Sequence, residues 1–124
     1  MSKISIRLLL FFLLLRIVFE LSFGVREIIG DGGSYNSYAL AILGQNDWLT
    51  NPSFFGNSRE PVYPLFLSLV YLLFGKGNFN AVYIIQAFMS VFTLYYIYRL
   101  STAFFGEKKS ILTLVWAGFY ISYL

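Results

Sequence analysis

Long apolar segments constrain this chain more than any other feature. Segments 4–23 and 79–105 each hold the ~20 helical residues that cross a hydrocarbon core of ~30 Å, and a third runs from residue 110 to residue 124 without a stop signal. Hydrophobic residues make up 58% of the 124 residues, and a soluble fold of this size cannot bury that much apolar surface. We therefore expect an all-α integral membrane protein with about three transmembrane helices, the third of them truncated.

A shorter apolar segment, residues 62–74, lies between Pro61 and Gly75. As a helix it covers only ~20 Å, which is short for a crossing and typical of a helix at the membrane interface. Without a crossing there, segment 24–78 lies outside, and five basic residues near the ends of the spanning segments fall on the cytoplasmic side, as the positive-inside rule requires. These cytoplasmic residues are Lys3, Arg7, Arg99, Lys108 and Lys109.

The exterior segment 24–78 contains a second short helical pattern over residues 34–43. Tyr35, Tyr38, Ala39 and Ile42 follow the spacing of one helix face, which predicts a helix lying on the membrane surface. The whole chain is then a single multi-pass domain of the cytoplasmic (inner) membrane, with a cytoplasmic N-terminus.

The missing residue types limit the chemistry of the chain. It has no Cys and no His, which excludes disulfides, thiolate nucleophiles, the usual zinc sites and imidazole acid–base catalysis. Its net charge of +3 is too small and too scattered for a nucleic-acid surface. Any catalysis must come from carboxylates, Lys, Arg, Tyr or a metal held by oxygen.

Asp31 is the first candidate for such chemistry, because it stands among three glycines directly before the short helix. Its carboxylate is suited to act as a general base or to bind a divalent cation such as Mg²⁺ or Mn²⁺. A helix cap or an Asx turn explains the same residue without any function. The spacing of the residues leaves both interpretations open.

Arg59 and Glu60 are the second candidates, because Pro61 and Pro64 fix the backbone where the chain returns to the membrane. The Arg59 guanidinium is suited to bind a lipid phosphate, and it is equally suited to anchor a helix among headgroups. Glu60 is either a second acid or simply the neighbour of Arg59. In the first membrane segment, Arg16 and Glu20 lie four residues apart, a spacing that fits pairing, packing between helices or snorkelling.

Several short motifs follow the first membrane helix in a fixed order. They are D-x-x-x-Y-x-x-x-A from Asp31, then Gly44, R-E-P-V-Y-P at 59–64, L-F-G at 73–75, Y-R-L at 98–100 and F-F-G at 104–106. In order and spacing they resemble the N-terminal part of the membrane-embedded GT-C glycosyltransferases, in particular the bacterial relatives of the protein O-mannosyltransferases and the lipid A aminoarabinose transferase. The resemblance covers nearly the whole chain and implies a piece of a much larger helix bundle.

The resemblance assigns roles to the candidate residues. It implies that Asp31 is the base or helps to place a metal and the acceptor, although Gly32 occupies the position of a second acid found in many members. It also implies that Arg59 lies near a lipid phosphate and that Tyr35 and Glu60 contact substrate. In this chain Glu60-Pro61 replaces the proline pair of the family.

The expected function follows from that resemblance. The chain would be the N-terminal portion of an enzyme of the cell envelope that transfers a hexosyl or pentosyl group from a polyprenyl-phosphate-linked donor at the outer membrane face. As a separate polypeptide it is expected to be inactive, with membrane lipids and the remainder of the enzyme as partners. Two alternatives stay open: a small non-catalytic membrane protein that packs against a partner, and a transporter fragment supported only by Arg16 and Glu20.

Overall fold

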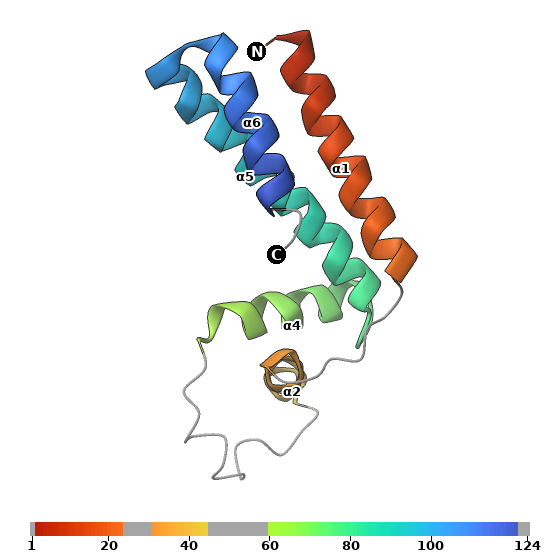
Figure 1. The fold of residues 1–124 in the computed structure, drawn as a ribbon. Helices are drawn as coiled ribbons and strands as arrows, with labels where there is room; N and C mark the ends of the chain where they lie inside the picture. Colours follow the sequence, from red (N-terminus) through yellow and green to blue (C-terminus); the bar gives the residue numbers. More distant parts are fainter. Residues whose placement is uncertain (1, 24–30, 45–59, 122–124) are drawn as a thin grey trace. The chain divides into compact units, whose positions relative to one another are not determined.

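The computed structural model describes residues 2–23, 31–44 and 60–121, and these residues form helices without any strand. The all-α prediction is therefore confirmed for the described part of the chain. Figure 1 shows the helices, which are α1 (Lys3–Phe23), α2 (Asp31–Ile42), α4 (Val62–Phe74), α5 (Phe79–Phe105) and α6 (Glu107–Ile121).

By their internal contacts the residues divide into two compact units. Unit 1 comprises Met1–Gly24 and Tyr83–Leu124, and so contains α1, most of α5 and α6. Unit 2 comprises Val25–Val82 and contains α2 and α4. The prediction that residues 1–124 form a single membrane domain stays a prediction.

Unit 1 is built around one apolar core to which all three of its helices contribute. Leu94 and Tyr98 of α5 are buried there, and each is at most 1% exposed. Because 94 and 98 are four residues apart, both side chains lie on the same face of α5. The other buried members of this core are Leu9, Phe12 and Leu114.

Gly106 makes the turn between α5 and α6, and the turn is a single residue long. Its φ of 77° is in the left-handed region, where a side chain would be strained. Its N–H donates to the Thr102 carbonyl at 3.2 Å, which caps the end of α5. The buried Tyr98 hydroxyl donates to Glu107 Oε1 at 3.1 Å across the turn, so a polar contact also joins the two helices.

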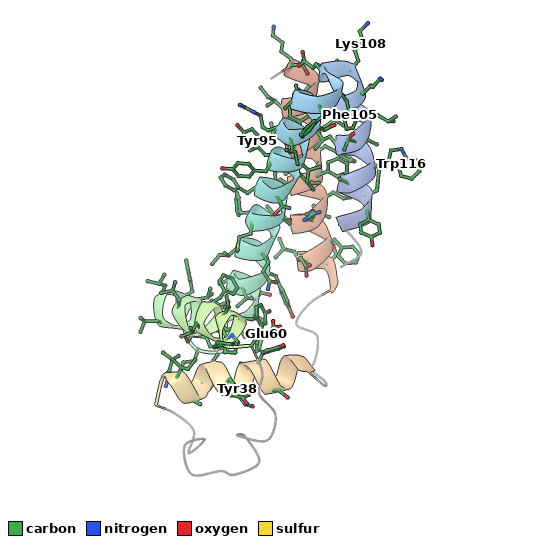
Figure 2. The ribbon with its side chains drawn as sticks, turned by 90° about the vertical axis from the view of Figure 1, so that its left-hand side faces the viewer. Tyr38, Glu60, Tyr95, Phe105, Lys108 and Trp116 are labelled. Carbon is green, nitrogen blue, oxygen red and sulfur yellow. The ribbon has the colours of Figure 1, made fainter. Side chains whose placement is uncertain are left out.

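One described helix, α5, is long and apolar enough to cross a bilayer by length and composition. α1 has a suitable length of 21 residues but contains four ionisable side chains, and α6 is described over 15 residues. Fewer helices therefore meet this criterion than the three that the sequence predicts. The outer surface of unit 1 is nevertheless strongly apolar, with large exposed side chains such as Phe104 and Trp116, shown in part in Figure 2.

Unit 2 consists mainly of the contact between α2 and α4, which cross one another in Figure 1. Two small residues of α2, Ala39 and Ala41, are buried. α4 buries one face, and its opposite face is both apolar and exposed. The buried side chains of α4 are Pro64, Leu67, Ser68, Val70 and Tyr71, and the exposed ones include Val62, Leu65, Leu69 and Leu72.

Candidate functional site

The residues predicted for the site lie at the beginnings of α2 and α4. Asp31 is the first residue of α2, so this helix begins three residues earlier than the predicted 34–43. Glu60 precedes α4 and is exposed (Figure 2). Arg59 and the side chain of Asp31 lie outside the described part of the structure.

A contact between two aromatic rings brings these two helix beginnings together. Tyr35, one turn after Asp31, meets Tyr63 of α4 edge to face, with ring centroids 5.2 Å apart. Tyr63 also stacks on Phe66, with centroids 6.0 Å apart. Segments almost thirty residues apart in sequence are therefore adjacent in space, and Glu60 stands three residues before the contacting Tyr63.

A partly buried hydrogen bond joins the same two helices further along. The hydroxyl of Tyr71, which is 2% exposed, donates to Oδ1 of Asn36 at 2.8 Å. The Tyr71 ring also meets Phe79 edge to face at 6.0 Å between centroids. Asn36, Tyr63 and Tyr71 were not among the residues predicted for the site, and the polar Asn36 directly beside Tyr35 was the available signal in the sequence.

We expect Tyr71→Phe to destabilise the packing of α2 on α4 by about 1 kcal/mol, because it removes one hydrogen bond and keeps the ring. The measurement is thermal unfolding of the purified chain in lipid nanodiscs. Tyr120→Phe is the matched control, since Tyr120 is largely exposed and its substitution should change little. Asn36→Ala should add little further loss to Tyr71→Phe, and fully additive losses would contradict the coupling.

The chemistry available at this place is that of aromatic rings and carboxylates. Among the described residues no group of three His, Cys, Asp or Glu side chains is placed to hold a metal ion. Of the predicted stripe of α2, Tyr35 contacts Tyr63 of α4 and Ala39 is buried, whereas Ile42 is 42% exposed. Aromatic faces and carboxylate oxygens are also groups that bind the C–H faces and hydroxyls of sugars.

The comparison with known families decides the class of the protein. Residues 58–124, more than half of the chain, match the family described as dolichyl-phosphate-mannose-protein mannosyltransferase. The chain belongs to this family. Its membership supports the predicted GT-C glycosyltransferase relationship, and the matched residues include Glu60, Tyr63 and helices α4 to α6. No curated protein and no solved structure matches the chain.

Membership of the mannosyltransferase family agrees with an apolar, helical chain. The family indicates a mannosyltransferase-like glycosyltransferase, and α5 has the length and composition of a membrane helix. The match begins just before Glu60, so α1 and α2, with Asp31 and Tyr35, precede the matched residues.

Proposed function

We propose that this member of the mannosyltransferase family takes part in transfer of a sugar from a polyprenyl-phosphate-linked donor to an acceptor at the outer face of the cytoplasmic membrane. The match of residues 58–124 to the family carries the proposal. The contact of Tyr35 with Tyr63 supports it further, because it brings the second turn of α2 next to the first turn of α4.

In the proposed reaction, an acceptor hydroxyl oxygen attacks the anomeric carbon of the donor sugar in one displacement. The bond from that carbon to the phosphate oxygen breaks, and polyprenyl phosphate leaves with the bonding electrons. Asp31 accepts the hydroxyl proton as general base. A single displacement inverts the configuration at the anomeric carbon. The anomeric configuration of the product therefore tests this mechanism.

The remaining roles go to residues near the start of α4. Arg59 would donate two hydrogen bonds to the leaving phosphate, whose negative charge grows as the bond breaks. Tyr35 would contact the sugar through its ring, and Glu60, which is exposed, would accept hydrogen bonds from sugar hydroxyls. If Asp31 binds Mg²⁺ or Mn²⁺, the ion would supply further positive charge near the phosphate.

The test is transfer of labelled sugar from a polyprenyl-phosphate-linked donor in membranes that contain the protein. We expect transfer that depends on this donor, and Arg59→Ala should raise its KM by about 10- to 100-fold, with Arg59→Lys in between. Lys76→Ala is the matched control, since Lys76 is an exposed cation between two glycines. Transfer from a nucleotide sugar, with none from the lipid-linked donor, would refute the proposed function.

We also propose the membrane arrangement that this function requires. α1, α5 and α6 would cross the membrane with the N-terminus in the cytoplasm, and α4 would lie at the outer interface. Its two different faces support this placement, because one packs on α2 and the other exposes apolar residues.

Spin labels can separate a helix that lies on the membrane from one that crosses it. The chain has no cysteine, so single Cys substitutions at Val62, Leu65, Leu69 and Leu72 give unique labels on the exposed face of α4. For an interfacial helix we expect similar depths at all four positions. A crossing helix would instead separate positions 62 and 72 by ~15 Å. Labels at Phe92 and Phe104 of α5, both exposed, should differ in depth and serve as the control.

A further inference from the structure

Arg16 is a buried cation for which the described structure offers no counter-charge. It lies in α1 and is 8% exposed, and its Nε and Nη2 atoms are buried without a hydrogen-bond partner. Glu20 lies one turn further along α1, and within the described residues no ion pair joins the two. An arginine placed before a glutamate is also the weaker order for such a pair within one helix.

The two unpaired nitrogens point to the kind of group that would bind there. Nε–H and one N–H of Nη2 lie along the same edge of the planar guanidinium, and together they can donate two parallel hydrogen bonds to one carboxylate or phosphate. The chain's own atoms cover this edge, so a group on another helix reaches it when the flexible Arg16 side chain turns the edge outward. An unpaired charge buried at membrane depth is costly, so such side chains normally face a partner or water.

The position of Arg16 along α1 favours a carboxylate over a lipid phosphate. Arg16 is ~10 Å along the helix from Phe23 and ~20 Å from Lys3, so it is well inside a hydrocarbon core. Helical side chains lean toward the N-terminus of their helix, which directs Arg16 away from its nearer end. Lipid phosphates lie outside the hydrocarbon core, whereas an acidic side chain on a neighbouring helix can be present at this depth.

We propose that Arg16 is the cationic half of an intramembrane ion pair, whose carboxylate is an aspartate or glutamate on another membrane helix packed beside α1. That helix lies outside the described residues. The inference uses the membrane placement of α1 proposed above, and it does not depend on transferase activity. Charge complementarity and the unpaired edge of the guanidinium carry it.

The test compares the same substitution with and without the partner helix. Arg16→Met, Arg16→Lys and Arg7→Met are made in the 124-residue chain, and Arg7 is the matched control because it is an exposed arginine of the same helix. The melting temperature is measured for the chain alone in phosphatidylcholine nanodiscs and for the protein in its native membrane.

Opposite shifts are expected in the two settings. In nanodiscs Arg16→Met removes an unpaired charge and should raise the melting temperature by several degrees. In the native membrane it leaves the partner carboxylate unpaired and should lower the melting temperature by several degrees, with a smaller loss for Arg16→Lys. Arg7→Met should change neither value by more than about one degree. If Arg16→Met fails to accumulate only in the native membrane, while Arg16→Lys accumulates, the proposal is also supported.

Two results would overturn the proposal. An upward shift in both settings would mean that no carboxylate reaches Arg16 in the native protein. A downward shift already in nanodiscs would mean that the anion is a lipid phosphate or Glu20 of the same chain. The melting temperature of Glu20→Gln in nanodiscs then distinguishes the lipid phosphate from Glu20. If Arg16 pairs with Glu20, Glu20→Gln should lower the melting temperature as much as Arg16→Met does.

Discussion

Asp31→Asn is expected to lower the rate of sugar transfer by about 10²- to 10⁴-fold, the usual contribution of a general base. Asparagine keeps the shape of the side chain and can still occupy the first turn of α2, but it cannot take a proton from the acceptor hydroxyl. The loss should therefore appear in kcat more than in the KM for the donor. The measurement is the initial rate of transfer of labelled sugar in native membranes, divided by the amount of folded protein.

Two further measurements separate a catalytic Asp31 from one that only stabilises the helix. Asp47→Asn is the matched control, since it makes the same chemical change at the other aspartate of the chain and should leave the rate unchanged. With a base at Asp31, the wild-type rate falls at acid pH as the carboxylate is protonated, and Asp31→Asn should lose this dependence. A full rate in the folded Asn variant would exclude the catalytic role.

A metal role for Asp31 predicts a different pattern. If its carboxylate holds Mg²⁺ or Mn²⁺, Asp31→Asn should raise the ion concentration needed for half-maximal rate, and excess ion should restore part of the activity. A general base without a metal predicts the same loss at every ion concentration.

The second large effect is expected at the contact between α1 and α6. Phe12 is fully buried, and its ring meets Phe119 edge to face with centroids 5.4 Å apart. We expect Phe12→Ala to destabilise unit 1 by about 3 kcal/mol, the lower end for a buried phenylalanine, because lipid surroundings reduce the hydrophobic part of the loss. The matched control is Phe11→Ala, since Phe11 is 50% exposed and should cost well below about 1 kcal/mol.

Gly118 makes this contact possible, because a Cβ atom at residue 118 would collide with the Phe12 ring. Gly118→Ala alone should therefore destabilise by about 1–3 kcal/mol through overpacking. Combined with Phe12→Ala, the same methyl group enters the space that the ring has left, so the double variant should be more stable than the sum of the two losses predicts. Additive losses in thermal unfolding in nanodiscs would show that the two residues do not share this contact.

Helix boundaries were predictable wherever strong local signals mark them. Pro61 and Gly75 delimit α4 at Val62–Phe74, and the long apolar segment of α5 is observed at Phe79–Phe105. The start of α2 was not predictable in this way, because glycines disfavour a helix in isolation and indicate a turn. Packing of α2 on α4 outweighs that preference, since most helix stability in proteins comes from the buried face.

The residues of the candidate site stay a prediction from the sequence, and the sequence did not predict how the helices around them pack. Asp31 and Glu60 stand out because charged residues are rare in this chain and both adjoin turn residues. The contact of Tyr35 with Tyr63 came only from the structure, because it joins segments too far apart in sequence for any periodicity to relate. Asn36 and Tyr71, which are hydrogen-bonded between the two helices, carry no sequence signal strong enough to pair them.

The sequence by itself determined the apolar, helical character of the chain and its membership of the mannosyltransferase family, because composition, periodicity and motif order are properties of the chain read along its length. Only the tertiary structure decided which side chains meet: the Phe12 ring on Gly118, Tyr71 on Asn36, and, within the described residues, no carboxylate on Arg16. Such contacts depend on how helices distant in sequence pack and rotate against one another. A large apolar surface permits many such packings, so the pattern of apolar residues alone does not select one.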